Sequence, residues 1–229
     1  PINIDEILEW TFNHDIIQTS EDLKWAIKDF EKTFNCRDAT NVFIFFLIKN
    51  QFETIKEPLI DYICKYGEKS GASFGAIYFL YGKETAYQAI KYSKELHLER
   101  RQKDRIKKCK ELFDALENGE VKIRRDIRYN AKLQLYEIYE LYYLFNTPVT
   151  YINRYFRTLN EFACFLSFDL SGVDLSHAPI TEKDVETYKI DNKTKLPFKI
   201  QCLTYEVIKK YEKQRFIVIQ RWQDSQQKE

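Results

Sequence analysis

The chain has 229 residues, with 36 Lys and Arg against 35 Asp and Glu, so its net charge is +1. Hydrophobic residues make up 44% of the sequence and charged residues 31%, while Gly and Pro number only 6 and 5. A chain of this length and composition can bury a sizeable core, which excludes collagen-like, low-complexity and wholly disordered proteins. The longest apolar run, residues 42–48, is far shorter than the roughly 20 residues that span a bilayer.

Cysteine and histidine usage points to a reducing compartment and away from metal chemistry. The five cysteines are scattered and never spaced as C-x-x-C, which argues against a disulfide framework. His14, His97 and His177 lie far apart in the sequence, so we predict neither a metal site nor a cofactor. We expect a cytoplasmic protein or, if the chain is an effector, one delivered into a host cytosol.

Helical signals dominate the first part of the chain. Residues 19–22 (Thr-Ser-Glu-Asp) offer N-cap side chains, and apolar residues then follow at spacings of 4, 3 and 4 from Leu23 to Phe34. Residues 42–48 are apolar on every side and must be a central element. Their length and their β-branched and aromatic content would also suit a buried strand. We favour a helix because the neighbouring elements are helical.

Three further helices are expected before residue 97. Glu57 and Pro58 form the first turn of one helix, which Gly67 ends. A second helix begins at Ser70 and ends at Gly82, and a third element follows from residue 84. These elements would pack as pairs of helices.

Two of these pairs follow a regular period. Phe46–Leu47 and Phe79–Leu80 lie 33 residues apart, and each ends a short apolar helix that a second helix follows. This period resembles that of the ankyrin repeat over residues 40–97. The T-P-L-H signature is absent, since residues 39–42 read Ala-Thr-Asn-Val and residues 71–74 read Gly-Ala-Ser-Phe. The resemblance implies a stack of helical hairpins with a protein-binding face, within a first region of residues 1–97.

A long antiparallel helix pair is expected next. Residues 84–117 contain no Pro or Gly and end at Asn118–Gly119, a strong helix-stop signal. Apolar residues from 127 to 145 then recur at spacings of 4, 4, 3, 4 and 3, which indicates a second long helix. Pro148 would start another helix, and a last one would run through residues 203–222. The sequence therefore predicts an all-α protein whose second region, residues 84–229, packs continuously with the first.

The segment after residue 166 changes character. Residues 167–171 (Ser-Phe-Asp-Leu-Ser) and 172–176 (Gly-Val-Asp-Leu-Ser) resemble two units of a pentapeptide repeat. About four units are needed for each coil of such a solenoid, so we predict an ordered loop instead. Asp169, Asp174 and His177 share this loop and could hold a metal or transfer protons. Aspartates in turns usually bond to nearby backbone amides, and we favour that role.

Positive charge is the strongest functional signal. Folding the expected helix pair at Gly119 would place residue 110 opposite residue 128 and merge two basic clusters into one band, suited to an anionic partner. The basic band comprises Arg100, Arg101, Lys103, Arg105, Lys107, Lys108, Lys110, Lys122, Arg124, Arg125 and Arg128. Its partner would be an acidic protein face, a phosphoinositide-bearing membrane or nucleic acid. Alternatively, the basic band is a helix face that is exposed to solvent and binds no partner.

Nucleic acid is the least favoured of these partners. Base stacking requires exposed rings beside basic groups. Here Tyr136, Tyr139, Tyr142 and Tyr143 fall at core positions of the expected helix, and Tyr129 is the single aromatic residue inside the second basic cluster.

No catalytic residues are assigned, because phosphate-binding loops, nucleophile elbows and H-E-x-x-H helices are missing from the sequence. Cys109 lies between two lysines, which favour a thiolate, and Cys36 could pair with His14 or His177 in a Cys–His enzyme. We favour a non-catalytic protein-binding module, by analogy a bacterial effector that contacts a host protein. Membrane binding through the basic band and an enzyme using a cysteine or the Asp169–His177 loop are the alternatives. The oligomeric state stays open.

Overall fold

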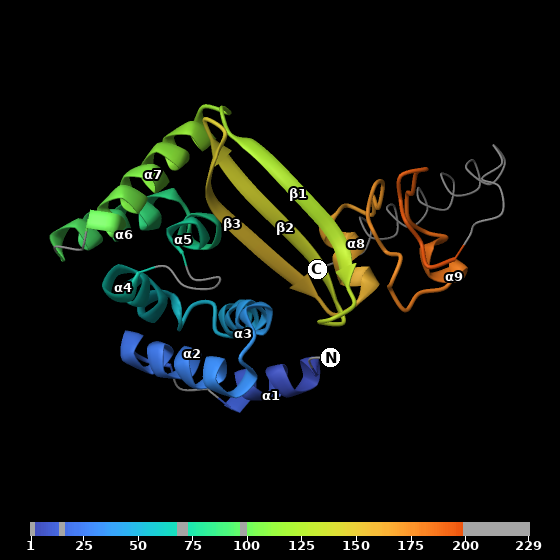
Figure 1. Ribbon diagram of the computed structural model, residues 1–229, viewed down its shortest axis with the longest axis horizontal. Coiled ribbons are helices and arrows are strands. Elements are labelled where there is room, and N and C mark those ends of the chain that lie inside the picture. The colour runs from blue at the N-terminus through green and yellow to red at the C-terminus, as the bar shows by residue number, and fades with distance from the viewer. Residues whose placement is uncertain (1–2, 14–16, 68–72, 97–99, 199–229) are drawn as a thin grey trace, which may run out of the picture. The chain divides into compact units, whose positions relative to one another are not determined.

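A computed structural model describes residues 3–13, 17–67, 73–96 and 100–198 (Figure 1). These residues form nine helices and three strands. The elements are α1 (Ile4–Asn13), α2 (Ser20–Phe34), α3 (Arg37–Asn50), α4 (Lys56–Tyr66), α5 (Phe74–Tyr81), α6 (Lys83–Glu95), α7 (Arg100–Glu117), β1 (Lys122–Asn130), β2 (Leu135–Leu144), β3 (Thr147–Phe156), α8 (Leu159–Phe165) and α9 (Glu182–Val185). The chain divides into two compact units, residues 1–126 with 138–154 (unit 1) and residues 127–137 with 155–229 (unit 2).

The first region is helical, as predicted, but its elements differ in detail. Helix α5 begins at Phe74 after the N-cap Ser73, the expected start at Ser70 lies outside the described residues, and α1 was not predicted. Helix α2 begins after the N-cap Thr19, whose side chain accepts a hydrogen bond from the Asp22 amide while the Asp22 carboxylate bonds back. This capping box satisfies amide groups that lack partners within the helix. Residues 42–48 lie within α3 and are helical, and they are buried on almost every side.

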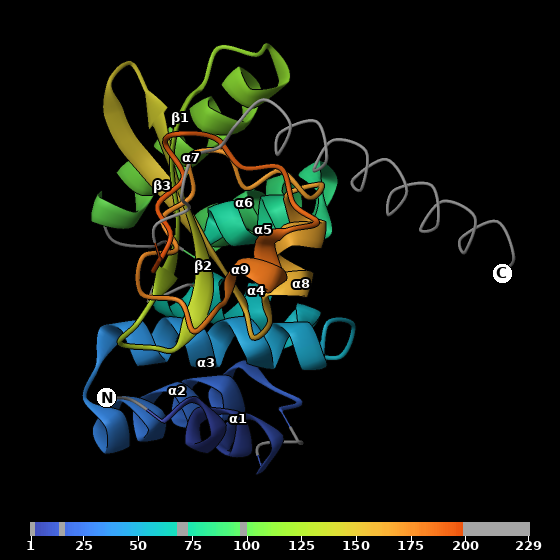
Figure 2. The same cartoon turned by 90° about the vertical axis from the view of Figure 1, so that its right-hand side faces the viewer.

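The helices of unit 1 pack side by side around an aromatic core. Helix α2 contacts α3 and α4, α4 contacts α6, and α6 contacts α5 and α7. In Figure 2 these helices follow one another upward from α2 through α3 and α4 to α6. The rings of Phe30 and Phe43 stack with their centroids 4.5 Å apart, and both residues are fully buried. Burying each such side chain stabilises the fold by roughly 1.5–3 kcal/mol.

Residues 122–156 form a sheet, so the prediction of an all-α protein is wrong. The strands β1, β2 and β3 lie in sequence order and run antiparallel. The expected second long helix is therefore absent from the described residues, and no long antiparallel helix pair forms there. A turn at residues 131–134 interrupts the helical spacing, with Gln134 in the left-handed region at φ 55°. The Tyr and Ile content of β2 favours a strand.

The ends of the expected long helices also differ in part from the prediction. Helix α6 ends at Glu95 and α7 begins at Arg100, so the run from residue 84 to 117 contains two helices. Helix α7 ends as predicted, with Gly119 at φ 71°. Pro148 lies at the start of the edge strand β3, where a missing amide proton is tolerated. The helix expected through residues 203–222 lies outside the described residues.

The prediction of an ordered loop after residue 166 is confirmed in unit 2. The two Asp-Leu-Ser turns repeat one bonding pattern, in which Asp169 accepts from the Ser171 amide and Asp174 from the Ser176 amide. Isolated parallel bridges join Asp169 to Lys189 and Asp174 to Lys195. Leu170, Val173 and Leu175 are buried beneath these turns. Among the described residues, no helix combines the length and apolar character that crossing a bilayer requires.

Candidate functional site

A groove runs along α2, α4 and α6 within unit 1. We call it the helix groove; it has a volume of about 730 Å³. Helices α4 and α6 contribute both polar and apolar side chains to its walls, whereas α2 and the residues before it contribute polar ones. Its polar walls include Gln18, Glu21, Lys56, Glu57, Thr85 and Gln88. A concave surface shared by several elements is the usual form of a binding site.

Asp61 of α4 connects the three helices at the groove. Its carboxylate accepts hydrogen bonds from Ser20 of α2 and from the Tyr92 hydroxyl of α6, the latter at 3.2 Å. Lys65, one turn along α4, places its Nζ 2.7 Å from Asp61 Oδ2. This spacing of four residues brings the two side chains onto one helix face. The groove is therefore held in shape by a carboxylate with three donors.

These bonds also determine the charge of Asp61. Burial acts to raise the pKa of Asp61, but the hydrogen bonds from Lys65 and Ser20 outweigh it, so the pKa lies below its ordinary value. Asp61 is thus a stable carboxylate at neutral pH. An ionised, fully bonded carboxylate is suited to fixing geometry and not to donating a proton.

The residues of the basic band on α7 lie in unit 1. Lys103, Lys107, Lys108 and Lys110 are exposed, as is Arg105, while Ile106 and Phe113 are buried on the other side of the helix. One lysine, Lys107, lies 3.9 Å from Glu111. Arg100 and Arg101 belong to α7, but their side chains lie outside the described residues. Helix α7 therefore carries an exposed positive surface by itself.

The basic residues after Gly119 belong to β1 and not to a helix. The pairing that would have placed residue 110 opposite residue 128 does not form, because β1 pairs with β2. In Figure 1, α7 and the first part of β1 meet at their connection and diverge from it. Lys122 and Arg124 are exposed on β1.

Two arginines of the basic band bind buried glutamates of β2. In unit 1, Arg125 Nε lies 2.7 Å from Glu140, and Arg154 Nη1 lies 2.5 Å from the same carboxylate. Burial acts to raise the pKa of Glu140, but the bonds from Arg154 and Arg125 lower it below its ordinary value. In unit 2, Arg128 Nη2 lies 3.2 Å from Glu137. These arginines therefore hold the sheet together.

The candidate catalytic groups lie on different elements of the chain. Cys109 is buried in α7, and Cys36 is half-buried at the start of α3. His14 and His97 lie outside the described residues, and His177 is exposed. In the loop of unit 2, Lys189 and Lys195 bind Asp169 and Asp174 at 2.7 and 2.8 Å. These two carboxylates have the turn-forming role that the sequence favoured.

No cluster of potential metal ligands occurs in the part of the chain that the structure describes. Cys64 and Cys164 are free thiols. Burial raises the pKa of the Cys64 thiol to about 11, so this group stays protonated at neutral pH.

Sequence reasoning missed Asp61 and its partners. The spacing of four residues between Asp61 and Lys65 is that of a helix ion pair, a signal that the sequence offered but that we did not use. Ser20 was identified only as one of the capping residues 19–22. Their convergence with Tyr92 depends on the packing of three helices, which spacing along the chain does not reveal. Comparisons of the chain with protein-family models, curated proteins and solved structures find no match.

Proposed function

We propose that the chain is a non-catalytic protein-binding module whose helix groove receives a polar segment of a partner protein. The observation that carries this proposal is the groove of about 730 Å³ along α2, α4 and α6. Gln18, Thr85 and Gln88 supply neutral donors and acceptors there, which can bond to a peptide backbone. Tyr92, which is 37% exposed, offers the kind of ring that anchors protein interfaces.

The bonding of Asp61 supports this proposal. Side chains that are held in place before binding lose less conformational freedom when a partner arrives, so more of the contact energy appears as affinity. The Tyr92 hydroxyl donates a hydrogen bond to Asp61, which holds the Tyr92 ring against α4. The free thiols of Cys64 and Cys164 suit an encounter in a cytoplasm, either of the producing cell or, for an effector, of a host.

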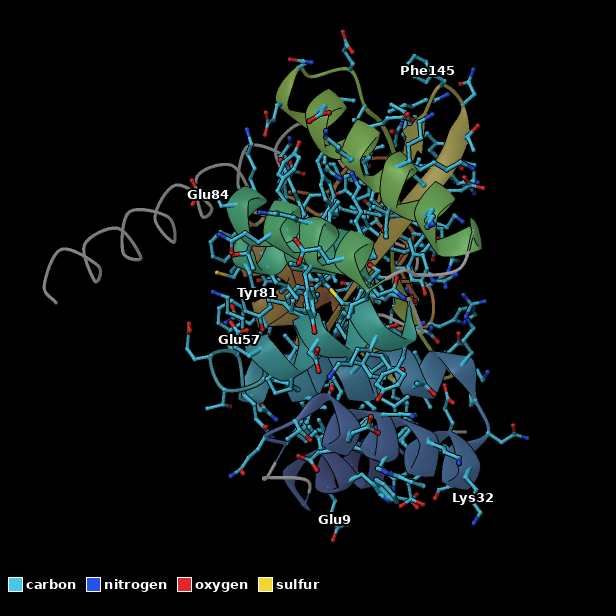
Figure 3. All side chains as sticks on the ribbon, turned by 90° about the vertical axis from the view of Figure 1, so that its left-hand side faces the viewer. Glu9, Lys32, Glu57, Tyr81, Glu84 and Phe145 are labelled. Atoms are coloured by element: carbon cyan, nitrogen blue, oxygen red, sulfur yellow. The ribbon has the colours of Figure 1, made fainter. Side chains whose placement is uncertain are left out.

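Site-specific cross-linking tests this function. A photoreactive residue at Gln88 in the groove is expected to capture a partner, whereas the same residue at Glu9 of α1 is not. Figure 3 shows that Glu9 lies on a different side of the helices from Glu57, which lines the groove. The captured protein is then purified and titrated against the wild type, Tyr92→Ala and Gln88→Ala. We expect Tyr92→Ala to weaken binding about fivefold or more. Equal affinity for all three proteins would refute a role for the groove.

The positive surface of α7 supports a second candidate, binding to a phosphoinositide-bearing membrane. Three of its exposed lysines, Lys103, Lys108 and Lys110, have no ion pair among the described residues. Each basic residue near an anionic membrane contributes about 1 kcal/mol. Co-sedimentation with phosphoinositide vesicles should therefore fall sharply for Lys108→Glu with Lys110→Glu and with rising salt. Retention of vesicle binding by this variant would exclude α7 as the contact.

A further inference from the structure

The two faces of the sheet differ within unit 1. Helix α5 covers one face, where the rings of Phe79 and Tyr142 lie 4.8 Å apart and Gly75 approaches Thr150. Successive side chains of a strand point to opposite faces. Tyr139 and Tyr143 therefore point away from α5.

Tyr151 of β3 joins them on that second face. The ring centroids of Tyr139 and Tyr151 are 5.9 Å apart, and Tyr143 lies on the same face of β2 as Tyr139. All three side chains are half-buried, so each leaves part of its ring accessible. We call Tyr139, Tyr143 and Tyr151 the tyrosine face. Tyr139 and Tyr143 are four residues apart on β2, a separation of roughly 14 Å, which leaves room for separate bases.

Cations flank the tyrosine face. Arg125 points to the covered face, where it binds Glu140, so its neighbour Arg124 points to the tyrosine face, as does Lys122. Neither Arg124 nor Lys122 has an ion pair within the described ranges of the chain.

Arg37 of α3 also reaches this surface. A hydrogen bond with the hydroxyl of Tyr151 raises the pKa of the Arg37 guanidinium. The acid on the same face of β1 is Asp126, which is half-buried and engaged in an interaction of its own. The surface thus combines accessible rings with exposed positive charge.

We propose that the tyrosine face binds single-stranded nucleic acid, with bases stacked on its rings and phosphates held by Lys122 and Arg124. Every base has a flat aromatic face, so stacking on tyrosine is largely independent of sequence. Rings on an antiparallel sheet are one of the surfaces on which proteins stack unpaired bases. Charge complementarity with phosphate favours this ligand over a protein partner.

The four tyrosines between residues 136 and 143 do not occupy the core of a helix, as the sequence predicted, because they belong to β2. Their helical placement was the reason for which nucleic acid was the least favoured partner. Tyr136 and Tyr142 are each only 4% exposed, whereas Tyr139 and Tyr143 are on the other face and half-buried. Because side chains alternate between the two faces of a strand, Tyr139 and Tyr143 lie on one face of β2 and Tyr136 and Tyr142 on the other.

Fluorescence anisotropy with the full chain tests the proposal. The probes are labelled oligouridine RNA, oligothymidine DNA and a duplex of mixed sequence, each at low and moderate salt. Both single strands are expected to bind more tightly than the duplex, and a difference between them would identify contacts to the 2′-hydroxyl. Tyr139→Ala and Tyr151→Ala should each weaken binding about fivefold or more. Tyr139→Phe should retain it.

Two further variants separate stacking from charge and from misfolding. Phe145→Ala is a matched control, because it removes an 88% exposed ring from the β2–β3 turn, seen at the top in Figure 3. It should leave the affinity unchanged. Arg124→Ala should reduce the slope of log affinity against log salt by about 0.7, as expected for one lost phosphate contact. Circular dichroism and thermal melting verify that each variant is folded.

Three results would overturn the proposal. The first is equal affinity for the duplex and the single strands, which would indicate attraction to any polyanion. The second is unchanged binding by folded Tyr139→Ala and Tyr151→Ala. The third is the absence of oligonucleotide binding by the wild type at low salt. In that case, capture of a protein by a photoreactive residue at Tyr143 would identify the face as a protein-binding surface.

Discussion

The helices of unit 1 and the loop of residues 167–198 in unit 2 are ordered by different means. The helices bury large rings against one another, as Phe30 and Phe43 do. The loop buries mainly aliphatic side chains, such as Leu170 and Leu175, and is also held by hydrogen-bonded turns and by the pairs that Asp169 and Asp174 form with lysines. Close packing resists changes in volume, whereas exposed ion pairs respond to pH and salt. The two regions should therefore fail under different perturbations.

The largest expected effect is on the packed helices. Phe43→Ala removes a fully buried ring from α3 and should lower the free energy of unfolding by about 3–5 kcal/mol, because a cavity remains beside Phe30. Denaturant unfolding followed by circular dichroism measures this change. Trp25→Ala is the control, since Trp25 is 61% exposed and its loss should change stability by no more than about 0.5 kcal/mol. Similar losses for both variants would contradict the packed core.

A smaller effect of the same kind is expected where α5 approaches the sheet. A Cβ atom at residue 75 would overlap the side chain of Thr150, so Gly75→Ala should cost about 1–3 kcal/mol despite its better helix propensity. Removing the obstacle with Thr150→Ala should restore part of that loss in the double variant. Thermal melts of the single and double variants provide the comparison. Simple additivity of the two changes would argue against this contact.

The capping box of α2 tests a polar contribution within the packed region. Thr19→Ala removes the acceptor of the Asp22 amide and should lower stability by about 1 kcal/mol. Thr19→Ser is the matched control, because it keeps the hydroxyl. Equal losses for the alanine and serine variants would assign the effect to the methyl group instead.

The loop should respond to acid more than to changes in volume. A hydrogen bond from Lys195 is the main cause that lowers the pKa of Asp174 to about 2. Burial acts to raise the pKa of Asp169, but bonds from Lys189 and Ser171 bring it to about 2 as well. The pKa of each carboxyl is lower in the folded chain than in the unfolded chain, where it is about 3.9. Each carboxylate therefore stabilises the fold at pH values above about 3.9, and this stabilisation is lost as the pH falls toward 2.

The expected loss is modest because both pairs are partly exposed, about 1 kcal/mol or less for each after solvent screening. Denaturant midpoints measured near neutral pH and in acid should therefore shift more for the wild type than for the double variant Asp169→Asn, Asp174→Asn. An identical acid shift in both proteins would assign it to other carboxylates.

The sequence predicted most helices of the first region but missed α1, the break between α6 and α7, and the whole sheet. Capping residues and Gly stops mark α2, α4 and the end of α7, since these signals act over a few residues. The strands were missed because their turns lack the usual glycines: Gln134, Phe145 and Asn146 adopt positive φ angles instead. Apolar residues on both faces of β2 also imitate the spacing of a helix. Its Tyr and Ile content was the signal for a strand.

The candidate sites were less predictable still. The helix groove requires three helices to meet at Asp61, and the tyrosine face requires Tyr139 of β2 to lie beside Tyr151 of β3. Both arrangements join residues that are separated along the chain. The positive charge of α7 could be recognised because it is continuous in sequence. The second basic cluster could not be placed correctly, because residues 122–130 were expected to be helical and form the strand β1 instead. Arg125 and Arg128 therefore pair with glutamates of β2.

The division of the chain into units has a genetic consequence. Unit 1 is interrupted by residues 127–137 and unit 2 by residues 138–154, so each unit is encoded in two separate stretches. A single continuous stretch of the gene that carries all of one unit therefore also carries part of the other. The two units are thus expected to be inherited together.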